Sequence, residues 1–96
     1  MLPKKRPPTH PGEILLKEFL EPMGMTQVEL AKHLGWSWAR LNEIVNSRRG
    51  VSAGSALALG ETFGTGPEFW LNFQRDWDLW HAMKKHKPVT ALRKAG

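Results

Sequence analysis

Residues 26–46 read TQVELAKHLGWSWARLNEIVN, and this stretch predicts two short helices joined by a tight turn. Thr26 and Glu29, three residues apart, form the pattern of a capping box at a helix start. Gly35 suits the left-handed residue that ends a helix, and Ser37 suits the cap of the next one. Two short helices with a glycine at the bend outline a helix-turn-helix, whose second helix enters the major groove of DNA.

Apolar residues at helical spacing predict the buried faces of these two helices. The first helix is expected to bury Val28, Leu30, Ala31 and Leu34. The second is expected to bury Leu41, Ile44 and Val45. Ala31 is small where the two helices must cross closely. The outer face of the second helix is left free to enter a groove.

Three further helices are expected around this pair. Pro11 opens one with an Ile/Leu/Phe stripe, and residues 22–24, PMG, end it. Ser52 caps another, expected to bury Ala56, Leu57, Leu59 and Phe63. Pro67 opens the last one after residues 64–66, GTG. No stretch alternates as a strand would, so we expect an all-α, compact five-helix domain that contains a helix-turn-helix.

Charge divides the 96 residues into three parts. Residues 1–10 are expected to form a flexible basic arm, and residues 84–96 a basic, disordered tail. Residues 11–83 are expected to form the helix-turn-helix domain with a C-terminal dimerisation helix. The net charge is +5, yet residues 11–83 hold six basic and nine acidic residues. The basic charge therefore belongs to the ends, and it is a poor argument for nucleic-acid binding by itself.

Several functional classes find no support in the sequence. There is no cysteine, so disulfides and thiolate zinc sites are excluded and a reducing compartment is expected. No apolar run approaches the roughly 18 residues of a membrane span. The four histidines show no ligand spacing, and residues 64–66 lack the lysine of a phosphate loop. We expect a cytoplasmic protein that is not an enzyme, with no cofactor, no metal, no membrane partner and no small-molecule substrate.

Residues 9 to about 83 resemble the HigA-type antitoxins, a branch of the lambda-repressor-like (XRE) helix-turn-helix superfamily. The resemblance is carried by residues 10–15 (HPGEIL), 25–31 (MTQVELA), 46–49 (NSRR), 57–65 (LALGETFGT) and 67–74 (PEFWLNFQ). It implies a lambda-repressor-like fold and a dimeric repressor of its own operon on double-stranded operator DNA, nucleoid-associated when bound. It also implies a cognate partner, a RelE-like (HigB-type) mRNA interferase toxin that the antitoxin neutralises.

The sequence departs from the family pattern at three positions. Ser47 stands where glycine is usual. Gly60 stands within a helix where alanine is common, at a cost of about 1 kcal/mol against alanine. Trp38 stands where a polar, base-reading residue is more usual.

The predicted base contacts lie at the start of the second helix. Arg40 is the best candidate reader, because arginine can bind guanine O6 and N7 bidentately; a phosphate contact or a salt bridge is its alternative. Trp38 either packs on a thymine methyl or a sugar, or folds down on the protein beside Trp36. Ala39 would let the backbone approach the DNA, and Ser37 would cap the helix and donate to a phosphate.

The remaining predicted DNA contacts flank that helix start. In similar proteins the residue at Gln27 hydrogen-bonds a phosphate and braces the recognition helix. Asn42 and Glu43 point outward by helical phase, and Glu43 could accept from cytosine N4 or only solvate the face. Arg48 and Arg49 follow the helix and would neutralise phosphates.

An aromatic stripe on the last helix predicts a dimer. Trp70, Phe73, Trp77 and Trp80 fall at steps of three or four. We expect Trp70 and Phe73 to reach the core, and we take Phe73, Trp77 and Trp80 as the homodimer interface. A two-fold contact uses one patch on both subunits, and it would hold two recognition helices about 34 Å apart.

Three other functions remain open at this stage. One is a phage-type or stand-alone repressor without a toxin. Another is a protein-interaction inhibitor whose acidic body masks a basic partner. A third is a membrane-surface binder through the basic ends, which lack the large apolar residues that insert into lipid. The neighbouring reading frame discriminates among them, because a small basic toxin-like product favours the antitoxin.

Overall fold

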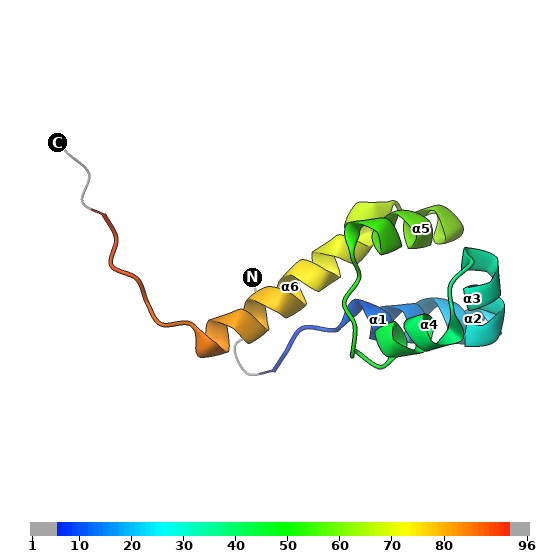
Figure 1. The fold of residues 1–96 in the computed structure, drawn as a ribbon, viewed down its shortest axis with the longest axis horizontal. Coiled ribbons are helices and arrows are strands. Elements are labelled where there is room, and N and C mark those ends of the chain that lie inside the picture. The colour runs from blue at the N-terminus through cyan, green and yellow to red at the C-terminus, as the bar shows by residue number, and fades with distance from the viewer. Residues whose placement is uncertain (1–5, 93–96) are drawn as a thin grey trace.

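The computed structural model describes residues 6–92, and these form helices joined by short turns, with no strand (Figure 1). The chain runs through α1 (Pro11–Ile14), the π-helical η1 (Leu15–Leu20), α2 (Glu21–Met23), α3 (Gln27–Leu34), α4 (Trp38–Val45), α5 (Ala53–Phe63) and α6 (Pro67–Lys85). Since α1, η1 and α2 follow one another without a break, they form one helix over residues 11–23. The prediction of an all-α, five-helix fold is confirmed for the described residues.

The helix over residues 11–23 is regular except in its middle. Pro11 starts it at a position where a proline costs no hydrogen bond. Over η1 each backbone hydrogen bond spans five residues instead of four, as in the bond from the N–H of Glu21 to the carbonyl of Leu16. The next residue, Pro22, has no N–H to donate. Gly24, at φ 64°, then ends the helix.

One core joins all five helices. Trp70 of α6 is fully buried at its centre, with the rings of Phe19, Phe63 and Phe69 around it. The other buried apolar residues are Leu15, Leu20, Leu30, Ala31, Leu41, Ile44, Val45, Val51, Ala56 and Leu59. The predicted inner faces of α3 and α4 are therefore correct at most positions.

Two predicted core residues face solvent instead. Val28 is 63% exposed and Leu57 is 54% exposed. Successive residues of a helix are turned by about 100°. Val28 therefore lies roughly 110° from the middle of the stripe of Leu30 and Ala31, and Leu57 lies roughly 130° from the middle of the stripe of Ala56 and Leu59.

At two positions only glycine fits, because the backbone of another segment lies too close for a Cβ atom. A Cβ on Gly12 would lie in hard overlap with the carbonyl oxygen of Ile44, where α1 crosses α4. A Cβ on Gly60 would lie 2.5 Å from the carbonyl carbon of Gly66. Gly60, one of the departures from the family pattern, thus lets α5 approach the start of α6.

α6 is the longest helix, and its C-terminal half extends beyond the other helices (Figure 1). It ends at Lys85, and residues 86–92 continue without helix or strand. No helix in residues 6–92 has the length and apolar character required to cross a membrane. The outermost residues of the predicted basic arm and tail, 1–5 and 93–96, lie outside the described residues.

Candidate nucleic-acid interface

The helix-turn-helix is formed by α3, the turn of residues 35–37 and α4. Thr26 accepts from the N–H of Glu29 at 3.1 Å, and the Glu29 carboxylate accepts from the N–H of Thr26 at 2.9 Å, so the predicted capping box is confirmed. Gly35 takes the left-handed conformation with φ 71°. The hydroxyl of Ser37 accepts from the N–H of Arg40 at 3.1 Å and caps α4, as predicted. Local sequence signals therefore set both ends of the turn.

A chain of amides braces α3 against α4. The Nδ2 of Asn42 donates to the Oε1 of Gln27 at 3.0 Å, and the Nδ2 of Asn46 donates to the Oδ1 of Asn42 at 3.1 Å. Asn42, expected to point outward, is thus half-buried against the start of α3. Gln27 lies where it can brace the recognition helix, as the family resemblance implies.

Arg40 is held on the protein surface in this structure. Its guanidinium lies over the ring of Trp36, 4.0 Å from the ring centroid, and its Nη2 donates to the Oγ of Ser55 at 2.9 Å. Ser55 belongs to α5 and is buried. The Arg40 side chain therefore extends from the first turn of α4 toward α5. The sequence had predicted that it would point to solvent from an exposed helix start.

Trp38 and Ala39 form the exposed edge of α4. Trp38 is 53% exposed at the first position of the helix, and Ala39 beside it is also exposed. Trp36, two residues earlier, packs against the hydrophobic core. Of the two alternatives for Trp38, the structure therefore has the indole directed to solvent and not folded down on the protein.

A Schellman motif ends α4. The N–H of Ser47 donates to the carbonyl of Ile44 at 3.0 Å, and the N–H of Arg48 donates to the carbonyl of Glu43 at 2.8 Å. The motif requires a left-handed residue, and Ser47 supplies it with φ 61°. The helix end therefore forms although the family's usual glycine is absent.

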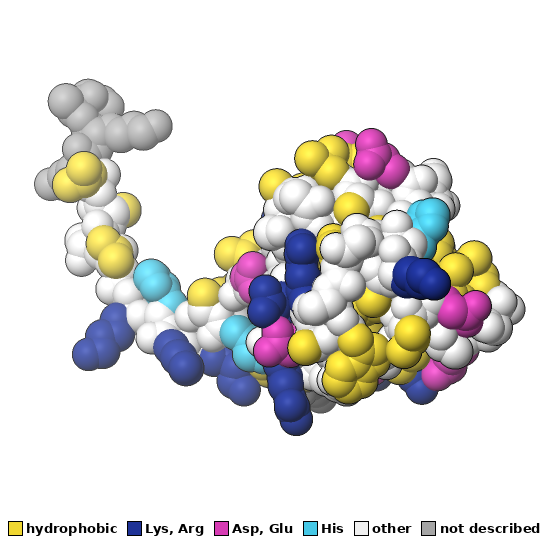
Figure 2. All heavy atoms as spheres, turned by 45° about the vertical axis from the view of Figure 1, so that its right-hand side comes forward, with side chains coloured by type: hydrophobic (Ala, Val, Ile, Leu, Met, Phe, Trp, Pro, Cys, Tyr) yellow, Lys and Arg dark blue, Asp and Glu magenta, His cyan; other side chains and the backbone are white. Residues whose placement is uncertain are grey.

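The two arginines after α4 differ in their surroundings. Arg49 donates through Nε and Nη2 to the Oε1 of Glu43, at 2.9 and 2.6 Å. Arg48 is exposed and makes no side-chain hydrogen bond or ion pair within residues 6–92. Glu43 therefore orients Arg49, and it is not a free outward acceptor. Figure 2 shows several Lys and Arg side chains toward the side of the body from which the C-terminal segment extends, with acidic side chains beside them.

The residues assigned to a dimer interface lie along α6. Phe73 is half-buried and its ring meets the edge of Phe69 at 5.2 Å. Trp77 is covered in part by its own chain, because its ring meets His10 at 4.9 Å. Lys84 lies over the ring of Trp80 at 4.4 Å. The side chains of Phe73, Trp77 and Trp80 are therefore all partly exposed on α6.

No structural role was predicted for His10, yet this residue connects α1 to α6. It is 3% exposed, its Nδ1 accepts from the N–H of Gly12 at 2.9 Å, and its ring packs on Trp77 of α6. Burial lowers its pKa, against the opposing effects of Asp78 and Glu13. Histidine is not among the usual N-caps. The only sequence signal for this cap was that His10 directly precedes Pro11, the first residue of the helix.

Gln74 and Ser55 were also missed. Gln74 accepts from the N–H of Val51, and Ser55 accepts from Arg40. Gln74 closes the last segment that carries the family resemblance, whereas a serine inside a helix gives no signal by itself. Gln74 thus joins the loop after α4 to α6, and Ser55 joins α4 to α5.

Comparisons with known proteins agree with this architecture. A helix-turn-helix family model matches residues 16–70. The chain is 49% identical to virulence-associated protein I of Dichelobacter nodosus, over 90% of this chain and 80% of the relative. It is 40% identical to antitoxin HigA-1 of Vibrio cholerae, over 86% of this chain and 78% of the relative. A solved structure, the Pseudomonas aeruginosa antitoxin HigA with the higBA promoter, has a TM-score of 0.78 and 41% identity, covering 81% of this chain and 85% of that one. The chain therefore belongs to the helix-turn-helix proteins, within the family of HigA antitoxins.

Proposed function

We propose that this chain is the antitoxin of a type II toxin–antitoxin module, a sequence-specific repressor that binds the operator of its own operon. The observation that carries the proposal is the exposed outer edge of α4, with Trp38 and Ala39 at its start and Arg48 just beyond its end. The family relationship supports it, because the Pseudomonas aeruginosa relative was solved with its promoter.

The proposed interface divides into positioning and reading residues. Gln27, Ser37, Arg48 and Arg49 make phosphate contacts that place the domain on the duplex. In this proposal Trp38 and Arg40 contact the bases, and Ala39 allows the backbone to come close to the DNA. Asn42 supports the interface through Gln27, and Glu43 supports it through Arg49. We keep Arg40 as the proposed base reader. In the free chain its guanidinium lies over Trp36 and donates to Ser55.

An Arg40→Ala variant tests the reading role. A bidentate contact to guanine is worth about 1–3 kcal/mol of discrimination. The variant is expected to lose that much affinity for the operator and to relax specificity at one base pair, measured by fluorescence anisotropy with single-substitution duplexes. Equal weakening on operator and random DNA would show that Arg40 contacts phosphate or only braces α4.

We also propose that the chain neutralises a RelE-like mRNA interferase. Such a toxin binds RNA and is therefore expected to be basic, and residues 11–83 of this chain carry more acidic than basic residues. The test is co-purification with the product of the neighbouring reading frame, followed by an in vitro mRNA cleavage assay. Stable association and loss of cleavage are expected. A neighbouring product that neither binds the chain nor cleaves mRNA would favour a stand-alone repressor.

The proposed partner in the repressor is a second copy, held through α6. Phe73, Trp77 and Trp80 offer one face. A neighbouring groove of about 540 Å³ offers another, and it is lined by Val51, Leu71, Leu79 and Ala82 together with Gln74, Arg75 and Asp78. Leu79 is 47% exposed there. Opposite charges beside an apolar centre can pair across a two-fold axis.

Two variants one residue apart assign the face. Light scattering of Leu79→Glu and Trp80→Glu is compared with the parent chain. Loss of the dimer in one of them identifies the face. A monomeric parent, or a dimer that survives both changes, would contradict dimerisation through α6.

A further inference from the structure

The loop of residues 46–52 joins α4 to α5 and carries Arg48 and Arg49. The Schellman bonds to α4 fix its first half. Its second half is fixed by a side chain from α6, because the N–H of Val51 donates to the Oε1 of Gln74 at 2.7 Å. The two ends of the loop are therefore attached to different parts of the fold.

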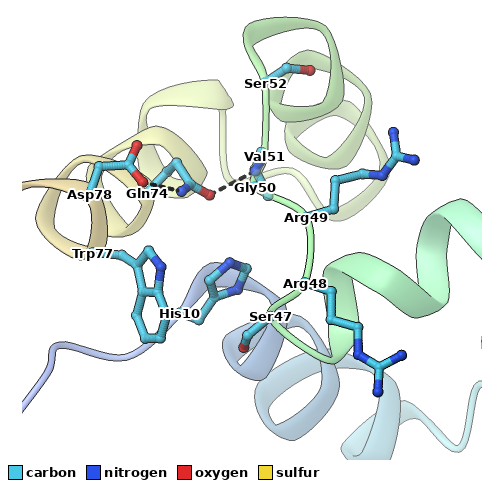
Figure 3. Close-up of a pocket in the computed structure, with 10 residues that line it drawn as sticks. All are labelled: His10, Ser47, Arg48, Arg49, Gly50, Val51, Ser52, Gln74, Trp77 and Asp78. Atoms are coloured by element: carbon cyan, nitrogen blue, oxygen red, sulfur yellow. Dashed lines mark hydrogen bonds between the residues drawn. The ribbon is translucent and has the colours of Figure 1, made fainter. Parts of the chain in front are cut away.

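The amide of Gln74 is itself held in one orientation. Its Nε2 donates to the Oδ1 of Asp78, one turn later on α6, at 2.9 Å. Figure 3 shows both hydrogen bonds, with the Gln74 amide between Asp78 and the loop. A carboxamide can accept with its oxygen while it donates with its nitrogen. An ionised glutamate or a methionine of similar length cannot do both.

Gly50 completes the contact. A Cβ on Gly50 would lie 3.0 Å from the Nε2 of Gln74 and 3.1 Å from its Oε1. The loop backbone thus lies directly against the amide, with no room for a larger residue unless the amide moves. The next residue, Val51, is buried in the core. This half of the loop is therefore seated on α6 by packing as well as by a hydrogen bond.

The geometry points to Gln74 as a positioning residue for DNA binding, which holds the loop so that Arg48 and Arg49 keep a fixed place beside the recognition helix. The inference rests on the proposed DNA-binding function. In Figure 3 both arginines extend away from Gln74 and Asp78, so the amide supports the side of the loop opposite the charges. Groups held in place before binding lose less conformational entropy on binding. Because α6 is also the proposed dimer helix, Gln74 links the dimer to the DNA-binding loop.

Three variants separate this role from simple stabilisation. Gln74→Met keeps the length of the side chain and removes both hydrogen bonds. Gln74→Glu keeps the acceptor for Val51 but places a second carboxylate beside Asp78. The double variant Gln74→Glu/Asp78→Asn restores a donor at 78 and an acceptor at 74, and it leaves the net charge as in the parent.

The first measurement needs no DNA. Hydrogen exchange of the Val51 amide is expected to be about tenfold faster in Gln74→Met and to return toward the parent rate in the double variant. The second measurement is affinity for the operator against salt, well below the unfolding temperature. Gln74→Met and Gln74→Glu are expected to bind about tenfold more weakly with a shallower salt dependence, and the double variant is expected to recover both.

A merely structural role would lower the unfolding temperature and leave the affinity and salt dependence of the folded protein unchanged. Parent-like DNA binding by Gln74→Met would overturn the inference, as would a double variant no better than Gln74→Glu. If the parent chain itself did not bind the operator, the proposed function would fail and the inference with it. A binding parent with an equally strong Gln74→Met variant refutes the inference alone.

Discussion

At the scale of single residues, Ser47 is the one non-glycine residue with a positive φ in the described chain, at 61°. The left-handed conformation costs a non-glycine residue roughly 1–2 kcal/mol, and glycine avoids that cost but loses more entropy on folding. We expect Ser47→Gly to stabilise the protein by about 0.5–1 kcal/mol and to raise the unfolding temperature by several degrees, measured by calorimetry. Ser47→Ala is the control and is expected to give no gain. A gain from alanine equal to that from glycine would show that the hydroxyl, and not the backbone, was unfavourable.

His10 makes stability depend on pH. The neutral ring accepts the N–H of Gly12, and burial lowers its pKa below the usual value of 6.5. The unfolded chain therefore binds a proton more readily than the folded one. The stability that neutral His10 contributes is complete above pH 6.5 and is lost as the pH falls through that value toward the lowered pKa of the folded state.

Urea unfolding of the parent and of His10→Asn between pH 5 and pH 8 measures this effect. Asparagine can cap a helix without titrating in this range. The free energy of unfolding of the parent is expected to fall more steeply on acidification than that of the variant. Parallel pH profiles would mean that His10 does not account for the dependence.

At the scale of elements, most helix boundaries follow from local chemistry. Thr26, Ser37, Ser52 and Pro67 start helices where the sequence predicted them, and Gly35 and Gly64 end helices. These signals act within a few residues, so a sequence displays them directly. The histidine cap of α1 was not predicted, because histidine is not among the usual N-caps. The π-helical η1 was not predicted either, because no local signal in residues 15–20 marked the i→i−5 pattern.

The positions of the predicted DNA-contact residues followed from the sequence, but the side-chain partners of these residues did not. The sequence located Gln27, Trp38, Arg40 and Arg48 on or beside α4. It did not reveal that Ser55 holds Arg40, or that Gln74 holds the loop, since these partners lie 15 and 23 residues away in the chain. Trp36 lies within one helical turn of Arg40, but its ring contact with the guanidinium was not predicted either. Side-chain pairs between separate helices follow from packing, which a helical pattern does not specify.

The approach of α5 to the start of α6 depends on Gly60. A Cβ there would meet backbone atoms of Gly66 and Pro67 at 2.5–2.8 Å, and backbone cannot swing aside as a side chain can. Overpacking costs about 1–3 kcal/mol and outweighs the gain in helix propensity of about 1 kcal/mol. We expect Gly60→Ala to lower the free energy of unfolding by about 1–2 kcal/mol.

Gly54, on the same helix, is the matched control. The nearest atom to a Cβ at that position is the Oγ of Ser52, 4.0 Å away. Gly54→Ala is therefore expected to raise stability by up to about 1 kcal/mol. If both alanines stabilised the protein in chemical denaturation, the close approach of α5 and α6 would not be the reason for Gly60.

At the scale of the whole molecule, acidic and basic residues are distributed unevenly along the chain. The helical body carries a slight acidic excess, whereas the segments outside it are basic. Positive charge reaches the proposed DNA side locally, through Arg40, Arg48 and Arg49. The C-terminal half of the long α6 extends away from the other helices (Figure 1), so the proposed DNA side and the proposed dimer surface are separate. Gln74 of α6 bonds the loop of residues 46–52, and so it lies between these two proposed surfaces.

Sequence-specific operator binding is the central claim, and a quantitative footprint on the DNA upstream of the chain's own gene tests it most directly. The predicted result is saturable protection of two half-sites whose centres lie about 34–36 Å apart on one side of the duplex. Affinity should fall steeply as salt rises, since phosphate contacts release counterions. Protection spread evenly along the DNA, or equal affinity for a scrambled duplex, would contradict the account.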